Sequence, residues 1–313
     1  MSDIEKVLII GSGPAGYAAA IYSARAGLSP LLISGLEPGG QLTITTDVEN
    51  YPGYENPIQG PWLMDQMRKQ SEIFGTKILN DYVINVDFNK IPFEISTNKV
   101  TFQSHSVIIA TGAKARWLGV DGEEEFKGFG VSACATCDGF FFKDKDVVVV
   151  GGGNTAVEEA IFLSNICKKV TLIHRRDKLR AEKILQDRMF EKKNIQVIWN
   201  NELKRVIGDS KQKTITKVLI EDTNDKKNQE LLLDGLFIAI GHQPATEVFL
   251  KKLKIDSDGY IITVPGTTQT NIDGVFAAGD VTDKIYRQAV TAAGMGCMSA
   301  LEAEKFLSKK KIT

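Results

Sequence analysis

The chain places short, wholly apolar runs before stretches in which small and apolar residues recur at helical spacing. Near its beginning, residues 7–10 predict a buried strand, residues 17–27 a helix and residues 30–33 a second strand. A glycine-rich turn, residues 11–16, joins the first strand to the helix. This order of strand, turn, helix and strand is the start of a parallel βαβ unit.

The same pattern returns later in the chain. A run of valines, residues 147–150, predicts a strand that leads into a second glycine-rich turn at residues 151–156. Residues 157–167 then predict a helix and residues 170–173 another strand. The sequence therefore contains two βαβ starts of the same design.

The two repeats also end alike. Residues 106–110 and 235–240 are apolar runs typical of buried strands, and they stop at Gly112 and Gly241. A glycine at such a position lets the backbone lie close to a ligand. Each repeat is thus expected to place open backbone at the end of its last strand.

The rest of the chain is expected to add small sheets and a closing helix. Polar stretches at residues 209–213 and 221–230 predict hairpin turns, residues 274–278 a strand that ends in Gly-Asp, and residues 288–307 a long helix. Because the last segment does not start a third repeat, the simplest topology returns it to the first domain. The second domain is then an insertion.

The predicted fold class is α/β, with two Rossmann-like dinucleotide-binding domains, the second inserted into the first. The first domain takes residues 1–114 and 245–313, and the second takes residues 115–244. The chain would cross between them near residues 113–116 and 242–246. A length of 313 residues agrees with two domains, because one domain usually takes about 150 residues.

Composition and charge exclude several classes of protein. The chain is 43% hydrophobic and 25% charged, which is ordinary for a globular protein. Its 38 Lys and Arg against 39 Asp and Glu argue against a nucleic-acid or anionic-membrane partner, since those are bound through a basic excess. No apolar run approaches the roughly 20 residues of a membrane span, and residues 1–6 do not resemble a secretion signal, so a cytoplasmic location is expected.

The first glycine-rich turn fits the dinucleotide fingerprint G-x-G-x-x-G. Gly11 would allow the tight turn, Gly13 the approach of a pyrophosphate, and Gly16 close packing of helix on strand. The residues between them are Ser12, Pro14 and Ala15. The alternative is a turn without a ligand, which the flanking strand and helix make less favoured. The acidic residue expected about 20 positions on is not at the strand end, and Glu37 is the nearest candidate.

The second turn has the permitted variant of this fingerprint, with Gly151, Gly153 and a closing Ala156 around Asn154 and Thr155. The next strand ends in a basic segment formed by His174, Arg175, Arg176 and, a little further on, Arg180. A ribose 2′-hydroxyl is matched by a carboxylate at this position, whereas a 2′-phosphate is matched by guanidinium groups. The segment therefore favours NADP over NAD, with a solvated basic turn as the alternative.

Two dinucleotide sites suggest a nicotinamide that delivers a hydride to a flavin. The electron acceptor could be the pair Cys134 and Cys137, because a C-x-x-C at a helix start favours a thiolate and can alternate between dithiol and disulfide. Asp138 could carry protons for these thiols, or it could simply cap the helix. Cys167 and Cys297 are expected to be small packing residues.

A zinc site is the rival interpretation of the cysteine pair. Structural zinc usually takes four Cys or His ligands, often as two such pairs. The chain has no second pair and only three histidines, of which His105 falls in a predicted strand and His174 in the nucleotide segment. The ligand count therefore argues against zinc, and no metal is expected.

Over essentially its whole length the chain resembles the low-molecular-weight, bacterial-type thioredoxin reductases. The most specific feature is the string Cys-Ala-Thr-Cys-Asp between two nucleotide fingerprints. The resemblance is carried by residues 11–16, 39–42, 48–53, 110–112, 133–139, 151–156, 174–177, 241–242, 279–280 and 286–289. Large disulfide reductases such as glutathione reductase carry their cysteine pair in the FAD domain instead, where residues 39–51 of this chain have no cysteine.

The resemblance implies an enzyme that passes electrons from NADPH to FAD, then to the Cys134–Cys137 disulfide, and finally to thioredoxin. The implied FAD contacts are Gly11, Ser12, Gly13, Pro14, Ala15, Gly16, Ser34, Gly35, Glu37, Gly39, Gly40, Gln41, Asn50, Thr111, Gly112, Gly279, Asp280, Arg287, Gln288 and Ala289. The implied NADPH contacts are Gly151, Gly153, Asn154, Thr155, His174, Arg175, Arg176 and Arg180.

The resemblance also implies that Cys137 faces the flavin, that Cys134 attacks thioredoxin, and that the protein is a homodimer whose two domains alternate between two orientations. Two other classes of function stay open at this point. One is a reductase for another acceptor, such as a peroxiredoxin or a small-molecule disulfide. The other is a non-enzymatic protein, either a flavin-loaded redox sensor or a zinc-held NADP-binding module.

Overall fold

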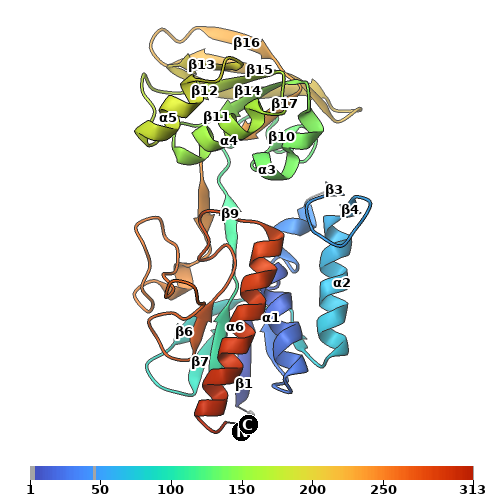
Figure 1. The fold of residues 1–313 in the computed structure, drawn as a ribbon, viewed down its shortest axis with the longest axis vertical. Coiled ribbons are helices and arrows are strands. Elements are labelled where there is room, and N and C mark those ends of the chain that lie inside the picture. Colours follow the sequence, from blue (N-terminus) through green and yellow to red (C-terminus); the bar gives the residue numbers. More distant parts are fainter. Residues whose placement is uncertain (1–3, 45–46, 313) are drawn as a thin grey trace. The chain divides into compact units, whose positions relative to one another are not determined.

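The computed structural model describes residues 4–44 and 47–312. The chain divides into two compact units (Figure 1). Unit 1 is Met1–Lys114 with Gln243–Thr313, and unit 2 is Ala115–His242. The second boundary between the units thus lies two residues earlier in the chain than the boundary expected from the sequence.

Unit 1 is built on a sheet in which β5, β2, β1 and β8 lie side by side and parallel, with β19 also parallel to β8. The N-terminal part of β8 pairs antiparallel with β7, and β7 pairs antiparallel with β6. The strands are β1 (Glu5–Ile10), β2 (Leu31–Ile33), β5 (Lys77–Leu79), β6 (Val83–Asp87), β7 (Phe93–Thr97), β8 (Thr101–Ile109) and β19 (Val275–Ala277). The strands expected around residues 7–10, 30–33, 106–110 and 274–278 are confirmed.

Three helices cover one face of this sheet: α1 (Pro14–Arg25), α2 (Gly60–Ile73) and α6 (Ala289–Lys309). Alternation along β1 explains how one strand serves two cores. Val7 and Ile9 point to the helices, while Leu8 and Ile10 point to the opposite core beneath β6 and β7. All four side chains are buried, as expected for a strand inside a parallel sheet.

Helices α1 and α6 lie side by side (Figure 1). Small residues allow this approach, since a Cβ on Gly296 would lie 2.1 Å from the carbonyl oxygen of Ala15. The C-terminal helix predicted at residues 288–307 is confirmed and runs two residues further, to Lys309. Unit 1 is completed by short pieces: η1 (Gly40–Ile44), β3 (Asp47–Val48), β4 (Ile58–Gln59) and η3 (Glu247–Phe249).

Unit 2 contains a five-stranded parallel sheet in the order β10-β17-β11-β12-β13. The strands are β10 (Val131–Ser132), β11 (Asp146–Val150), β12 (Lys169–His174), β13 (Ile195–Trp199) and β17 (Gly235–Ile238). The order β12-β11-β17 matches β2-β1-β8 of unit 1, so the two repeats in the sequence form equivalent sheets.

Two different layers cover this sheet. One face packs against α4 (Asn154–Ser164) and α5 (Lys183–Phe190), and the other against an antiparallel sheet of β14 (Asn201–Asp209), β15 (Thr214–Asp222) and β16 (Asn228–Leu232). The valines of β11 alternate between the faces, with Val147 and Val149 toward the helices and Val148 and Val150 toward the second sheet. The turns of this antiparallel sheet are the hairpin turns expected from the sequence.

Helix α4 ends at Ser164, so the prediction that it continues to Cys167 was wrong. The N–H groups of Asn165 and Ile166 bond three residues back, to Phe162 and Leu163, which tightens the last turn and ends the helix. Cys167 lies beyond the helix and is buried in the core. The apolar residues next to Cys167 continue the helical spacing in the sequence, although the helix itself has already ended.

The α/β fold class is confirmed, with two Rossmann-like units of which the second is inserted into the sequence of the first. The chain leaves unit 1 along β9 (Ala113–Ala115) and returns along β18 (His242–Pro244), and these two strands pair with each other. Within residues 4–44 and 47–312, no helix is both long and apolar enough to cross a membrane.

The core of unit 2 gives a direct test of this packing. Leu163→Ala removes a fully buried side chain from α4 and should lower the free energy of unfolding by about 2–5 kcal/mol. Glu158→Ala, on the exposed face of the same helix, should change it by no more than about 0.5 kcal/mol. Urea denaturation followed by circular dichroism measures both, and equal effects would contradict the packing described.

Candidate active site

The first glycine turn of unit 1 leaves no space for side chains at two of its three glycines. A Cβ on Gly11 would lie 2.3 Å from the carbonyl oxygen of Ala110, and a Cβ on Gly16 would lie 2.0 Å from the carbonyl oxygen of Gly11. Gly13 differs, because no described atom comes within 4 Å of its Cβ position. The turn is therefore closed toward the protein and open at Gly13, which suits the approach of a phosphate.

Ser12 connects this turn to the segment after β2. Its hydroxyl donates to the carbonyl of Ser34 at 2.7 Å and accepts the N–H of Gly39 at 2.9 Å. Gly40 lies against the same turn, since its Cβ position is 3.5 Å from Cα of Gly13. The structure thus brings residues 34–40 and the first turn together, as one site requires.

Glu37, the candidate acidic partner of a ribose, lies in this segment. Its carboxylate is exposed and pairs with Lys114 Nζ at 3.1 Å. Exposure leaves the carboxylate accessible to a ligand hydroxyl. Gln41 follows at the start of η1.

Further predicted residues lie where the strands and α6 meet the first turn. Gly279, just after β19, packs against Ala15, where a Cβ would come within 2.9 Å of the alanine side chain. Asp280 follows it, and burial raises the pKa of its carboxyl to about 7, with Asp283 adding to the rise and Arg287 opposing it. A desolvated carboxyl of this kind suits a hydrogen bond with a ligand hydroxyl.

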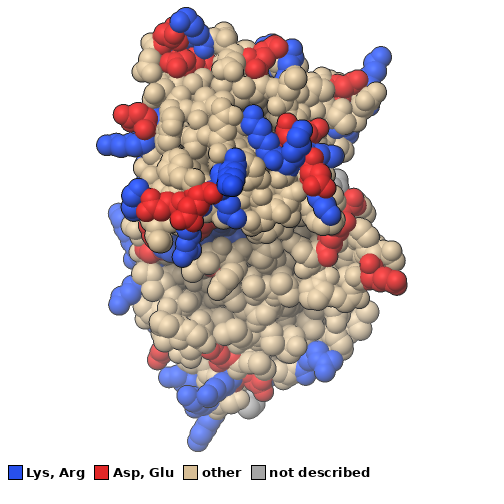
Figure 2. All heavy atoms as spheres, turned by 45° about the horizontal axis from the view of Figure 1, so that its top comes forward, with Lys and Arg blue, Asp and Glu red and all other residues tan. Residues whose placement is uncertain are grey.

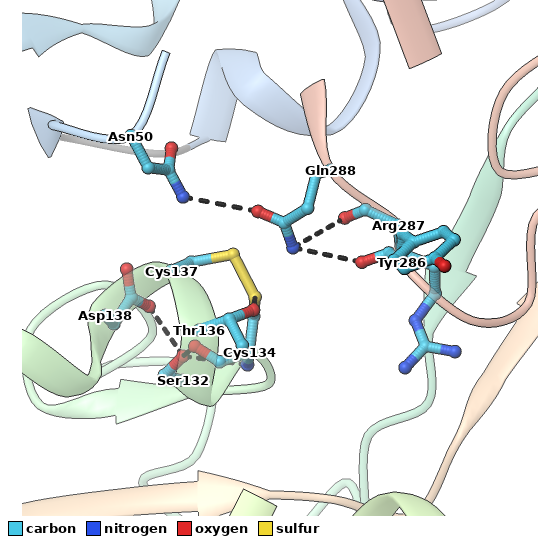
Figure 3. Close-up of a disulfide and its surroundings, with 9 residues drawn as sticks. All are labelled: Asn50, Ser132, Cys134, Thr136, Cys137, Asp138, Tyr286, Arg287 and Gln288. Atoms are coloured by element: carbon cyan, nitrogen blue, oxygen red, sulfur yellow. Dashed lines mark hydrogen bonds between the residues drawn. A yellow bond between two sulfur atoms is a disulfide. The ribbon is translucent and has the colours of Figure 1, made fainter. Parts of the chain in front are cut away.

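The last of the predicted FAD contacts lie at the start of α6. Gln288 is the N-cap residue of α6, and its side-chain oxygen accepts a hydrogen bond from Asn50 Nδ2 at 3.3 Å (Figure 3). Arg287 has a left-handed backbone (φ 48°), and its N–H donates to Asp283 at 3.1 Å. Thr111 follows shortly after β8, and its hydroxyl donates to the carbonyl of Ala245 at 2.8 Å.

The second glycine turn, in unit 2, is built in the same way. A Cβ on Gly151 would lie 2.4 Å from the carbonyl oxygen of Ala239 and 2.6 Å from Cβ of Ala156. At Gly153, no described atom lies within 4 Å of the Cβ position. Both turns therefore fit a dinucleotide, because each offers open backbone directly before a helix.

The basic segment after β12 lies against this second turn. The N–H of Arg180 donates to the carbonyl of Gly152 at 2.7 Å, while the side chains of Arg175, Arg176 and Arg180 are exposed. His174 differs from them, since it is buried (5% exposed) and turned into the protein. The three guanidinium groups are thus displayed beside the turn, as recognition of a 2′-phosphate needs.

Asn154 and Thr155 begin α4 directly after the turn. The Asn154 side chain is engaged with Glu182 in both directions: its oxygen accepts the Glu182 N–H at 2.9 Å and its amide donates to the carboxylate at 3.2 Å. Asn154 therefore ties the start of α5 to the turn.

Cys134 and Cys137 form a disulfide with their Cα atoms 5.3 Å apart (Figure 3). Cys134 is the N-cap of α3 (Ala135–Asp138), and its carbonyl accepts the N–H groups of Cys137 at 3.2 Å and Asp138 at 3.1 Å. The helix is a single turn, which continues as η2 (Gly139–Phe142). The cysteine pair is thus held in a bonded turn at the surface of unit 2, where it can exchange electrons as a disulfide.

Ser132 is a site residue that the sequence did not reveal. Its hydroxyl donates to the carboxylate of Asp138 at 2.5 Å and accepts the N–H of Cys134 at 3.0 Å (Figure 3). Burial raises the pKa of Asp138, and the bond from Ser132 lowers it by a smaller amount. A carboxyl with a raised pKa is suited to giving and taking protons.

The other two cysteines are not arranged for chemistry of this kind. Cys167 is buried, and burial raises the pKa of its thiol to about 11, which keeps it protonated and unreactive. Cys297 is half-buried in α6. Among the residues that the structure describes, no group of three His, Cys, Asp or Glu could hold a metal ion.

Charges of both signs are intermingled on the face drawn in Figure 2. The net charge of −1 agrees with this mixture. A large patch of one sign, which would attract nucleic acid or an anionic membrane, is not seen on that face.

Two turns of dinucleotide form and a disulfide define a nucleotide-dependent disulfide oxidoreductase. The chain belongs to the pyridine nucleotide-disulphide oxidoreductase family, whose model matches residues 5–296.

Individual relatives narrow the class. A protein of Rickettsia bellii named thioredoxin reductase is 62% identical over 305 residues, which cover 97% of this chain and 98% of that protein. The crystal structure of a thioredoxin reductase from Streptococcus pyogenes has a TM-score of 0.93 at 42% identity and covers 99% of this chain and 100% of its own. The corresponding structure from Giardia duodenalis has a TM-score of 0.92 at 43% identity, with coverages of 97% and 98%.

Proposed function

We propose that this protein is an NADPH-dependent, FAD-containing thioredoxin reductase. The observation that carries the proposal is the Cys134–Cys137 disulfide, placed in the unit that also has the second glycine turn and its three exposed arginines. Full-length relatives that share the name thioredoxin reductase support it. FAD is assigned to unit 1 and NADPH to unit 2, and the final electron acceptor is the disulfide of an external thioredoxin.

When bound, FAD supplies the redox chemistry that turns a hydride from NADPH into an electron pair for the disulfide. The Cys134–Cys137 bond accepts this pair and two protons and becomes two thiols. One of them, as thiolate, attacks the thioredoxin disulfide and forms a mixed disulfide. The second thiol then attacks the mixed disulfide, which releases reduced thioredoxin and restores the bond between Cys134 and Cys137.

Each cysteine and its neighbours have an assigned task. On the family resemblance, Cys137 faces the flavin and Cys134 attacks thioredoxin. Asp138 is assigned the movement of protons to and from the thiols, because its pKa is raised by burial. Ser132 holds both the Asp138 carboxyl and the backbone of Cys134, so it keeps acid and thiol in one geometry.

In unit 1, the first turn with Ser34, Gly35, Glu37, Gly39, Gly40 and Gln41 is assigned to FAD. The half-buried Asp280 is assigned to a cofactor hydroxyl, and the residues at the start of α6 to the flavin end. In unit 2, the second turn is assigned to the pyrophosphate of NADPH, and Arg175, Arg176 and Arg180 to its 2′-phosphate.

The cysteine assignment predicts a separation of two half-reactions. Cys134→Ser and Cys137→Ser should each reduce NADPH-dependent turnover of thioredoxin at least a thousandfold, because neither serine can form a disulfide. Reduction of the flavin by NADPH, followed as bleaching of its absorbance, should persist in both variants. Retention of thioredoxin reduction in either variant would disprove the mechanism.

Two controls complete this experiment. Cys167→Ser should retain turnover, since Cys167 is buried in the core and takes no part in the disulfide. The unchanged protein should reduce thioredoxin and leave glutathione disulfide essentially unreduced. A preference for glutathione disulfide would contradict the proposed acceptor.

The arginine assignment predicts a change in cofactor preference. Arg175→Ala combined with Arg176→Ala should raise KM for NADPH about a hundredfold and change KM for NADH by less than about threefold, because charge-assisted bonds contribute about 1.5–3 kcal/mol each. Steady-state kinetics with both cofactors measure this. Lys183→Ala is a suitable control, as it removes a nearby exposed cation that is already paired with Asp187 at 2.7 Å. Equal losses with both cofactors would rule out the phosphate role.

We also propose that the protein is a cytoplasmic homodimer, on the strength of the same family resemblance. Sedimentation equilibrium should give a mass near twice the 34.4 kDa of one chain at micromolar concentration. A mass of one chain at all concentrations tested would contradict the dimer. Fractionation of cells should recover the protein with cytoplasmic markers.

A further inference from the structure

His174 is the last residue of β12, and its ring is pressed against the second glycine turn. A Cβ on Gly152 would lie 2.1 Å from the ring's Cε1 and 2.2 Å from its Nδ1, so the ring occupies the space that any other residue at position 152 would fill. The ring also makes an edge contact with Trp199, with centroids 6.3 Å apart. These neighbours hold the imidazole in one place.

The ring makes one hydrogen bond to the basic segment. Nε2 lies 3.0 Å from the carbonyl oxygen of Lys178. A carbonyl oxygen can only accept, so Nε2 carries the proton and donates it. The bond therefore joins the ring, which is pressed on Gly152, to the backbone of the segment that displays the arginines.

A second bond closes the same segment onto the same glycine. The N–H of Arg180 donates to the carbonyl of Gly152 at 2.7 Å. Residues 175–179 thus form a loop attached to the turn at both ends, at one end through the His174 ring and at the other through the Arg180 backbone. Arg175 and Arg176 lie inside this loop and point to solvent.

The ring holds the loop without adding charge to it. Burial lowers the pKa of His174, and Arg176 and Arg180 lower it further, although the backbone groups of Lys178 and Gly151 oppose the shift. The lowered pKa favours the neutral imidazole at neutral pH, so the ring influences an anion through position rather than through charge.

We infer that His174 is a positioning residue for the 2′-phosphate site: by donating to Lys178 while packed on Gly152, it fixes Arg175, Arg176 and Arg180 relative to the turn and so sets the preference for a 2′-phosphorylated nucleotide. This rests on the proposed use of NADPH, and it gives His174 a role that involves no contact with the nucleotide. The ring links the part of the site that binds any dinucleotide to the part that selects among them.

The test uses two nucleotide fragments that differ only in the 2′-phosphate, 2′,5′-ADP and 5′-AMP, and measures their binding to the full protein by calorimetry. His174→Leu removes the donor and should reduce the ratio of the two affinities about tenfold, which corresponds to one hydrogen bond of about 1.4 kcal/mol. His174→Gln keeps an N–H donor at the end of the side chain and should restore most of the ratio. An equal ratio in all three proteins would overturn the inference.

A double-mutant cycle separates positioning from support of the fold. In a protein that already carries Arg175→Ala and Arg176→Ala, His174→Leu should change the ratio by less than about twofold, because the groups it positions are gone. A full tenfold fall in that background would overturn the inference. Circular dichroism identifies misfolding, and if His174→Leu does not fold, the comparison is made between His174→Gln and His174→Asn, whose shorter side chain should lose the ratio.

The outcomes distinguish this inference from the proposed function. If the unchanged protein binds 2′,5′-ADP no better than 5′-AMP, the proposed use of NADPH fails and the inference fails with it. If the unchanged protein prefers 2′,5′-ADP, and the preference survives loss of the His174 donor, the inference alone is wrong.

Discussion

At the first glycine of each turn, the backbone presses against the carbonyl oxygen of the residue that directly follows a neighbouring strand, β8 in unit 1 and β17 in unit 2. The position of a missing Cβ lies 2.3 Å from Ala110 in unit 1 and 2.4 Å from Ala239 in unit 2, distances that no side chain could adopt. Because of this closeness, the following helix begins shortly after the C-terminal end of the strand, at Pro14 in α1 and Asn154 in α4. The open middle glycine, the helix start and the segments that gather around them all depend on this one contact.

The sheets that support the turns are buried on both faces. In each unit a strand with four successive apolar side chains, from Val7 in β1 and from Val147 in β11, supplies two cores at once. A shift of one residue would move each side chain of such a strand to the opposite face of the sheet. Because both faces are apolar here, the hydrophobic pattern of the strand does not by itself fix the register. The register is instead fixed by the layers, which are helices on one face and a different structure on the other.

The features that the sequence could predict are those written in local patterns. The strands, the two glycine turns, the hairpins and the long C-terminal helix each depend on residues close together in the chain, and the structure confirms them. The end of α4 could not be predicted, because Cys167 is apolar for a reason of tertiary packing. Ser132 could not be found either, since its two partners become neighbours only when the chain turns back after β10.

His174 shows the same limit within a recognised motif. The sequence groups it with the three arginines that follow, yet its side chain is buried whereas theirs are exposed. Its counterpart in unit 1 is Ser12, which also connects a glycine turn to the segment after the second strand, although it lies in the turn itself. The two units thus connect the glycine turn to the segment after the second strand through different side chains. The shared fingerprint does not reveal which side chain makes this connection.

The pairing of β9 with β18 has a consequence for how such a chain can change. The chain enters unit 2 and leaves it through strands that are hydrogen-bonded to each other, and the N–H of Arg116 bonds to the carbonyl of Gly241 at the unit's own two ends. The inserted sequence therefore begins and ends at one place, so little loop-closure entropy is needed to accommodate it. A gene could lose, gain or exchange this segment as a cassette while the host sheet keeps its order, which makes the insertion a natural unit of recombination.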